Sequence, residues 1–277
     1  MTERLNASAA LRLVPGWDPG AAVIEQLQGG LTNRTYRVRC RDGEFVLRLD
    51  SPRSGAYRFD RSRELCILRQ AGKAGIAPEV IHADPDRGML LTRFLEGRAW
   101  DETDLRSTRK LEALADLLRR VHALPSSGTS IDMSAAAIAY QDYLDKGQYL
   151  HTFSARCVEV IATVAAHADK VCCHNDVVAA NLIAGRDLRL IDWEYACDND
   201  PMFDLASAIG FHDLDESQAD ALLDAYAGGA DAGLRERLAE QVRVYDAIQW
   251  LWLATRQLAH PGRRQARRLE ELQQRIR

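Results

Sequence analysis

The chain has 277 residues, of which 47% are hydrophobic and 27% are charged, which is typical of a globular protein with length for one large domain or two lobes around a cleft. The formal net charge is -4, so nothing attracts the whole molecule to a nucleic-acid backbone or an anionic membrane. These properties favour a small soluble ligand over a polyanionic partner.

Neither a signal peptide nor a disulfide framework is expected. The charged residues Glu3 and Arg4 are followed by no apolar run of signal-peptide length, and no uncharged stretch is long enough for a bilayer. The six cysteines form no C-x-x-C pair, and the adjacent Cys172 and Cys173 would point in opposite directions on a strand. We therefore expect reduced, mostly buried thiols and a cytoplasmic protein.

The first part of the chain predicts a five-stranded antiparallel sheet with one helix. Strand-like segments begin at Val23 and continue, between turn residues, over 35–39, 45–49, 79–82 and 89–94. Between the third and fourth of these, an amphipathic helix is predicted over 59–74, where Leu65, Ile67, Leu68 and Ala71 lie among arginine and glutamate residues.

Beyond Gly97 the pattern changes to helices. A first helix is predicted from Leu105 to Leu124, where leucines recur at helical spacing. Further helical patterns cover 134–150, 154–169, 217–227, 233–258 and 263–276, and a single strand-like interruption lies at 171–191. A junction at Leu95–Ala99 is expected to separate an N-terminal lobe, residues 1–95, from a C-terminal lobe, residues 96–277.

The strand-like interruption carries a polar loop, HNDVVAAN from His174 to Asn181, and then a hairpin that ends at Asp192. Asp176 can orient or deprotonate an attacking hydroxyl, while Asn181 and Asp192 supply oxygen ligands for Mg²⁺ beside nucleotide phosphates. The spacing from Asp176 to Asn181 agrees with the kinase catalytic-loop signature, and Asp192-Trp193-Glu194 takes the place of its D-F-G motif. The alternative is that these residues are ordinary turn formers and a strand-end cap.

The segments HNDVVAANLI and LIDWEYACDNDPMFDLA resemble the signature of the choline and aminoglycoside kinase superfamily, and within it the bacterial choline kinases. The resemblance extends from about Gly29 to Gln257. It implies an α+β, protein-kinase-like, two-lobed fold with a mainly helical C-terminal lobe. It also implies transfer of phosphate from ATP, with Mg²⁺, directly to a hydroxyl of a small, usually cationic molecule.

A nucleotide-covering turn is also implied by the resemblance, in the segment GGLTNRTYRV. Gly29 and Gly30 would let backbone amides approach the phosphates, and Thr32 and Asn33 follow in the same turn. We predict that these four residues bind the nucleotide.

Four further residues complete the nucleotide site that the resemblance implies. Arg48 would contact the α- and β-phosphates where protein kinases use lysine, and Glu64 would pair with it. The alternative is that Arg48 and Glu64 form an ordinary surface pair. The strand end that contains Thr92 and Phe94 would be the interlobe hinge whose backbone receives adenine.

The acceptor is predicted to be choline, because aromatic faces and a carboxylate recognise a quaternary ammonium. Glu194 and Tyr195 lie two and three residues after Asp192, and Trp250 and Trp252 lie on a late helix. The two tryptophans are two positions apart, so they face different directions and only one is expected to line a pocket, unless both belong to the core. Ethanolamine and thiamine are alternative acceptors, and an aminoglycoside fits less well because the C-terminal lobe is not strongly acidic.

Two residues are expected to support the loop without taking part in the chemistry. His174 would hold the loop by packing and hydrogen bonding, and Asp204, in DPMFDLA, resembles the structural aspartate of the superfamily. The non-enzyme alternative is a nucleotide-binding pseudokinase. The presence of Asp176, Asn181 and Asp192 argues against it.

Overall fold

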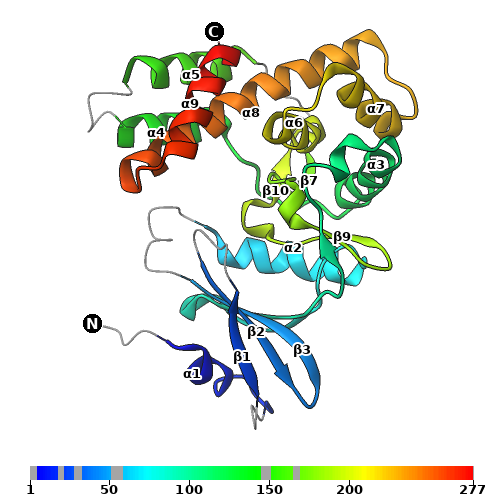
Figure 1. The fold of residues 1–277 in the computed structure, drawn as a ribbon, viewed down its shortest axis with the longest axis vertical. Helices are drawn as coiled ribbons and strands as arrows, with labels where there is room; N and C mark the ends of the chain where they lie inside the picture. Colours follow the sequence, from blue (N-terminus) through cyan, green and yellow to red (C-terminus); the bar gives the residue numbers. More distant parts are fainter. Residues whose placement is uncertain are drawn as a thin grey trace. The chain divides into compact units, whose positions relative to one another are not determined.

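The structure is a computed structural model that describes residues 5–17, 22–27, 33–50, 59–144, 151–164 and 169–276 (Figure 1). The chain divides into two compact units, one formed by residues 1–99 with 181–196 and the other by residues 100–180 with 197–277. The hairpin that follows the polar loop thus belongs to the unit that contains the N-terminal sheet, while the loop up to Ala180 belongs to the other.

The first unit is built on the expected antiparallel five-stranded sheet, in the order β1-β2-β3-β5-β4. Its strands are β1 (Val23–Leu27), β2 (Asn33–Cys40), β3 (Gly43–Asp50), β4 (Val80–Asp84) and β5 (Met89–Arg93). Strands β2 and β3 pair along their whole length, from Asn33 opposite Asp50 to Cys40 opposite Gly43. Alternate residues of β3, beginning at Phe45, are buried, which is the period-two pattern that predicted the strand.

A short helix that the sequence pattern did not predict packs against this sheet. Helix α1 (Ala7–Leu11) begins after Asn6, whose side chain accepts a hydrogen bond from the backbone N–H of Ala9. Ala10 and Leu11 are fully buried in one cluster with the apolar residues of β3 and β5. Five residues are too few to show a helical period, so packing rather than pattern defines this helix.

The remaining elements of the first unit are one long helix and a small three-stranded sheet. Helix α2 (Arg61–Lys73) begins at Asp60, whose carboxylate accepts the N–H groups of Ser62 and Arg63. The small sheet has the order β6-β8-β9 and consists of β6 (Arg98–Ala99), β8 (Leu182–Ala184) and β9 (Leu188–Leu190). Gly97 has a φ of 147°, and a Cβ there would lie 2.5 Å from the carbonyl oxygen of Ala184, so this close approach requires glycine.

The second unit is mainly helical, as predicted, around a two-stranded ribbon. Its elements are α3 (Thr108–His122), α4 (Met133–Leu144), α5 (His151–Thr163), β7 (Val171–Cys173), β10 (Cys197–Asn199), α6 (Pro201–His212), α7 (Glu216–Ala227), α8 (Ala232–Ala259) and α9 (Arg263–Ile276). The predicted helix over 105–124 is shorter, because a 3₁₀ turn at Asp104–Arg106 precedes α3. The end of the helix predicted over 134–150 lies outside the described residues, and α5 ends at Thr163 rather than at residue 169.

Helix α6 is the main element of the second unit that the sequence pattern did not predict. Its residues from Met202 to Gly210 are all buried, so the segment has no polar face and no hydrophobic periodicity. Its beginning carries the expected local signals, since the side chain of Asp200 accepts the N–H of Met202 and Pro201 occupies the first turn. Among the helices of the described segments, none has both the length and the apolar character that crossing a bilayer requires.

Candidate active site

The polar loop is held through its backbone. The N–H groups of His174 and Asn175 donate to the two carboxylate oxygens of Asp204, at 2.9 and 2.6 Å. The N–H of Val178 donates to the carbonyl oxygen of Asp176 at 3.0 Å, which forms a tight turn around the predicted base. The loop backbone is therefore fixed at and on both sides of Asp176, and His174 is fully buried.

Asn175, directly before Asp176, adopts a left-handed backbone conformation with a φ of 65°. Asparagine tolerates this conformation better than most residues because its short polar side chain can bond locally. Here the side-chain oxygen accepts from Asn199 Nδ2 at 2.8 Å, and the side-chain nitrogen donates to the carbonyl oxygen of Cys197 at 3.4 Å. The ribbon strand β10 thus stabilises the strained position next to Asp176.

Asp204 is a fully buried, ionised acceptor. Burial on its own opposes ionisation, but the hydrogen bond and charge of His122 and the interactions with His174 lower the pKa of Asp204. His122 Nε2 lies 3.0 Å from the Asp204 carboxylate, and its Nδ1 lies 2.8 Å from the hydroxyl of Tyr226. The carboxylate therefore has three donors, two from the loop and one from α3.

His122, Cys173 and Asp204 also have ligand atoms that lie within 4.8 Å of one another, as a metal site would require. Both ring nitrogens of His122 already have partners, and burial raises the pKa of the Cys173 thiol well above its usual value. A protonated thiol and an imidazole that is hydrogen-bonded on both sides are poor metal ligands. We therefore assign this cluster to the bracing of the loop.

The hairpin of the first unit brings the backbones at the two predicted metal ligands, Asn181 and Asp192, close together. Leu182 of β8 lies opposite Leu190 of β9, and the N–H of Ile191 donates to the carbonyl oxygen of Asn181 at 2.9 Å. Asp192 follows directly, with a φ of 65°. An amide oxygen and a carboxylate at the open end of one ribbon are the hard oxygen donors that Mg²⁺ binds, so these residues fit the ion.

Arg48 and Glu64 form a buried pair rather than a surface pair. The two guanidinium ends of Arg48 meet the two carboxylate oxygens of Glu64, one of them at 2.7 Å, and Glu64 is 2% exposed. Burial opposes the ionisation of both side chains. The Arg48 guanidinium nevertheless lowers the pKa of Glu64, and the carboxylates of Glu64, Asp192 and Glu194 raise the pKa of Arg48. Both members of the pair are therefore ionised.

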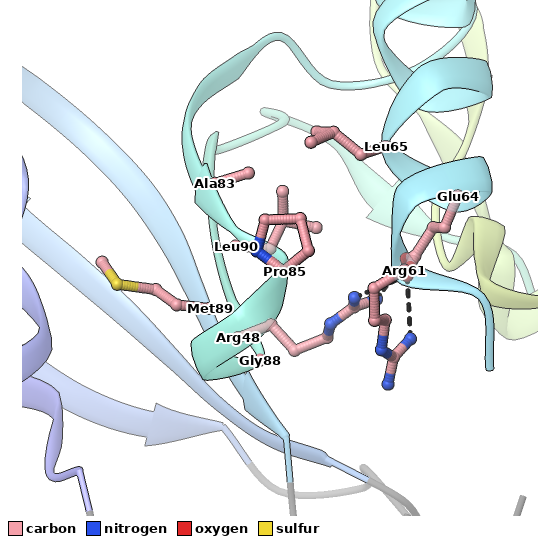
Figure 2. Close-up of a pocket in the computed structure, with 9 residues that line it drawn as sticks. All are labelled: Arg48, Arg61, Glu64, Leu65, Ala83, Pro85, Gly88, Met89 and Leu90. Carbon is pink, nitrogen blue, oxygen red and sulfur yellow. Dashed lines mark hydrogen bonds and ion pairs between the residues drawn. The ribbon is translucent and has the colours of Figure 1, made fainter. Parts of the chain in front are cut away.

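Arg61 is a member of this site that the sequence analysis missed. Figure 2 shows Arg48, from β3, converging with Arg61 and Glu64 from the first turn of α2, beside a pocket whose lining includes the loop before β5. Arg61 contacts Asp50, Glu64 and Glu194 at 2.9, 2.8 and 3.2 Å. The available signal was its position three residues before Glu64 on a helix, but its other partners are set by the fold alone.

Of the four residues predicted to bind the nucleotide in the turn before β2, the structure describes one. Gly29, Gly30 and Thr32 lie outside the described residues. Asn33 begins β2, and its side chain donates to Glu194 at 3.0 Å and accepts from Arg61 at 3.2 Å.

At the predicted hinge, the backbone is partly engaged within the sheet. Thr92 is buried on β5, opposite Val46. The N–H of Phe94 donates to the carbonyl oxygen of Glu44 at 3.0 Å, and the ring of Phe94 lies 4.2 Å from the guanidinium carbon of Arg37. The Phe94 amide is therefore already satisfied.

The predicted acceptor residues occupy contrasting environments. Glu194 is 3% exposed and is paired with Arg61, and the Tyr195 ring packs edge-on against Phe59 at 5.3 Å. Trp250 is fully buried against Phe153, with ring centroids 4.8 Å apart, so it is a core residue.

Trp252 is the partly exposed member of the tryptophan pair, which agrees with the expectation that the two face different directions. The guanidinium of Arg256, one turn further along α8, lies 4.8 Å from the centre of its ring. Arg256 thus covers one face of the aromatic ring with a positive charge.

The fold and the loop-hairpin arrangement define a kinase-like protein with a mixed sheet-and-helix first unit and a helical second unit. The model of the phosphotransferase enzyme family matches residues 23–240, and the chain belongs to this family. This confirms the resemblance on which the site assignments were based.

Three comparisons show the range of the relatives. Protein LicA of Haemophilus influenzae is 28% identical over 209 residues, which are 72% of this chain and 61% of LicA, so the match spans about six tenths of that relative. Thiamine kinase of Salmonella typhimurium is 29% identical over 242 residues, covering 84% of this chain and 80% of the enzyme. A choline/ethanolamine kinase family protein from Mesorhizobium loti has a solved structure with a TM-score of 0.75 and 25% identity, covering 98% of this chain and 92% of that one.

Proposed function

We propose that this protein is an ATP- and Mg²⁺-dependent kinase that phosphorylates the hydroxyl of choline to give phosphocholine. In this proposal residues 1–95 form the nucleotide-binding lobe and residues 96–277 carry the catalytic base and the acceptor site. The family membership and the kinase relatives support the phosphotransferase class. The choice of choline is the narrower part of the proposal.

One observation carries the proposal, namely the way in which the chain holds Asp176, Asn181 and Asp192. The backbone on both sides of Asp176 is tethered to buried acceptors, and the β8–β9 ribbon brings Asn181 next to the residue before Asp192. Positioned carboxylates of this kind are what phosphoryl transfer requires, because its catalysis comes mainly from alignment and charge neutralisation.

Each polar residue has a role in the proposed reaction. The Asp176 carboxylate accepts a hydrogen bond from the acceptor hydroxyl and receives its proton as the hydroxyl oxygen bonds to the γ-phosphorus, while the bond from that phosphorus to the bridging β–γ oxygen breaks and ADP leaves. Asn181 and Asp192 hold Mg²⁺, which neutralises charge on the triphosphate when bound. Arg48 contacts the α- and β-phosphates, and Glu64 fixes the direction of its guanidinium.

For the acceptor cation, Glu194 supplies the negative charge and Tyr195 and Trp252 supply aromatic faces. In the ligand-free first unit, Arg61 is paired with Glu194. A bound cationic acceptor would take the place of Arg61 as the positive partner of the Glu194 carboxylate. Trp250 is completely buried, so we assign the pocket-lining role to Trp252 instead.

Thiamine is the second candidate acceptor, because the thiamine kinase match covers 84% of this chain whereas the LicA match covers 72%. Ethanolamine, an aminoglycoside and a pseudokinase without turnover remain weaker alternatives.

A substrate panel tests the proposal directly. The purified protein would be incubated with ATP, Mg²⁺ and either choline, ethanolamine, thiamine or kanamycin, and the phosphorylated product would be quantified for each. We expect the highest kcat/KM with choline and no turnover in the presence of EDTA. Faster turnover of thiamine would replace choline as the acceptor, and absence of turnover with every alcohol would support the pseudokinase.

A further inference from the structure

Helix α6 holds the polar loop at more positions than Asp204. The N–H of Val177 donates to Ser207 Oγ at 3.0 Å, and the N–H of Ala179 donates to His212 Nε2 at 2.9 Å. The N–H of Asn175 donates to Asp204. The amides of every second loop residue, 175, 177 and 179, thus donate to three side chains of the same helix. All of these residues belong to the second unit.

We infer that Ser207 and His212 are positioning residues that set the backbone register of the loop and thereby the place of the Asp176 carboxylate. Asp176 lies between Asn175 and Val177, whose amides are both held by α6. A shift of the loop backbone by about 1 Å would move the Asp176 carboxylate away from a hydroxyl that is aligned for attack on the γ-phosphorus. Displacements of this size have large effects on the reaction rate.

Ser207 is fixed as an acceptor by its own helix. Its hydroxyl donates to the carbonyl oxygen of Asp204 at 3.0 Å, so the single proton is already used and a lone pair is directed at the N–H of Val177. Ser207 and Val177 are both fully buried, and without this oxygen the Val177 amide would lose its partner in a place that water does not reach.

His212 can hold Ala179 only as a neutral imidazole, because Nε2 must present a lone pair. Burial lowers the pKa of His212 to about 4, Arg106 and Arg268 act in the same direction, and Glu102 and Asp213 oppose it. The proton must then lie on Nδ1, which has no hydrogen-bond partner within the described part of the chain. The contact with the loop therefore fixes the tautomer of this buried histidine, which packing alone does not do.

Two amide variants separate positioning from packing. In His212→Gln the side-chain oxygen reaches about as far as Nε2, whereas in His212→Asn it reaches only as far as Nδ1 and cannot meet Ala179. The two substitutions are otherwise chemically matched. Ser207→Ala removes the neighbouring acceptor and serves as the complementary variant.

Amide hydrogen exchange, followed by NMR on the ligand-free protein, gives a readout that needs no substrate. We expect faster exchange of the Ala179 amide in His212→Asn but not in His212→Gln, with Val177 still protected in both. Ser207→Ala should show the reverse pattern, with fast exchange of the Val177 amide and continued protection of the Ala179 amide. If His212→Asn does not fold, the Ser207→Ala variant decides the question. Equal exchange of Ala179 in the two His212 variants, or no change in either, would overturn the inference.

Kinetics with choline then test the consequence for catalysis. We expect kcat to fall ~10-fold to ~100-fold in His212→Asn and to stay within about 3-fold of wild type in His212→Gln, with an unchanged KM for ATP. An equal fall in kcat for both variants would contradict a positioning role. If the wild type turns over no acceptor, the proposed function fails, while the exchange pattern still decides this inference.

Discussion

The two units hold their functional groups by different means. In the first unit, charged side chains hold one another: Arg48 and Arg61 share the carboxylate of Glu64, and Arg61 also contacts Glu194. In the second unit, side-chain acceptors on α6 hold backbone amides of the loop.

This difference matters because the two kinds of contact respond differently to a ligand. A phosphate or a cation can replace one partner of a charged cluster at little net cost, since one ion pair is exchanged for another. A buried backbone amide that loses its acceptor has no substitute, at a cost of about 1–3 kcal/mol. We therefore expect the first unit to rearrange its contacts when ligands bind and the loop of the second unit to stay in place.

The largest expected effect comes from removing the group that the rigid loop positions. Asp176→Asn should lower kcat on the order of 100-fold to 10,000-fold while the Kd for ATP stays nearly unchanged, because the amide cannot receive the hydroxyl proton. Steady-state kinetics and calorimetric ATP binding would measure the two quantities. A mutant with wild-type kcat would exclude Asp176 as the base.

The next largest effect comes from breaking the charged cluster. Arg48→Met leaves the buried Glu64 with Arg61 alone, so we expect the free energy of unfolding in urea to fall by roughly 3–5 kcal/mol and the KM for ATP to rise. Arg37→Met is the control, since the Arg37–Glu44 pair is more exposed and worth about 1 kcal/mol or less. Equal losses in the two variants would mean that burial does not distinguish the pairs.

The free energy of unfolding should depend on pH differently for the His212 contact of the second unit and for the charged cluster of the first unit. His212 has a pKa of about 4 in the folded state against 6.5 as its ordinary value, so below pH 6.5 the unfolded chain binds more protons and stability is lost as the pH falls. Between pH 7 and pH 5 the wild type should lose about 2 kcal/mol that His212→Gln does not lose. Urea unfolding at both pH values measures this difference, and parallel losses would show that His212 is not kept neutral by the fold.

Glu64 provides the contrast within the same experiment. Its pKa is lowered in the folded state, so its contribution to stability is present above its ordinary pKa and is lost only as the pH falls through the lower folded value. The charged cluster should therefore remain intact at pH 5, where the His212 contribution is already reduced.

The smallest expected effect concerns Arg256. Like Arg48 and Arg61, it makes a contact in which a ligand cation or anion could replace one partner, but its contact with Trp252 is weaker. If the face of Trp252 binds the acceptor cation, Arg256→Met should lower the KM for choline about 2-fold to 5-fold, as expected for a cation–π contact of about 0.5–1 kcal/mol. Trp252→Leu should raise it. An unchanged KM in both variants would remove Trp252 from the acceptor site.

Much of the fold could be predicted where sequence and environment have the same period. Strand β3 alternates buried and half-buried residues, and α3 buries its leucines on one side, so both carry a readable pattern. The short ribbon that links Asn181 to Asp192 could also be predicted, because a short hairpin separates the two residues, while the catalytic and metal-binding roles of Asp176, Asn181 and Asp192 stay predictions.

The parts that could not be predicted depend on contacts between residues distant in the sequence. Helix α6 is buried on all sides and has no periodic signal, although it supplies the acceptors for the loop. Arg61 meets Glu194 from 133 residues away, and His212 meets Ala179 from 33 residues away. No local spacing encodes such pairs, because the fold creates them.

The first unit is assembled from two separate stretches of chain, and this limits how the protein can be divided. A polypeptide that ends at residue 99 would carry β6 without its partner β8, and Arg61 without Glu194. A polypeptide that starts at residue 100 would retain the missing stretch as an unpaired insertion. Simple truncation at that boundary would yield an incomplete domain, and expressing the first unit alone would require the 181–196 peptide to be supplied in trans or fused after residue 99.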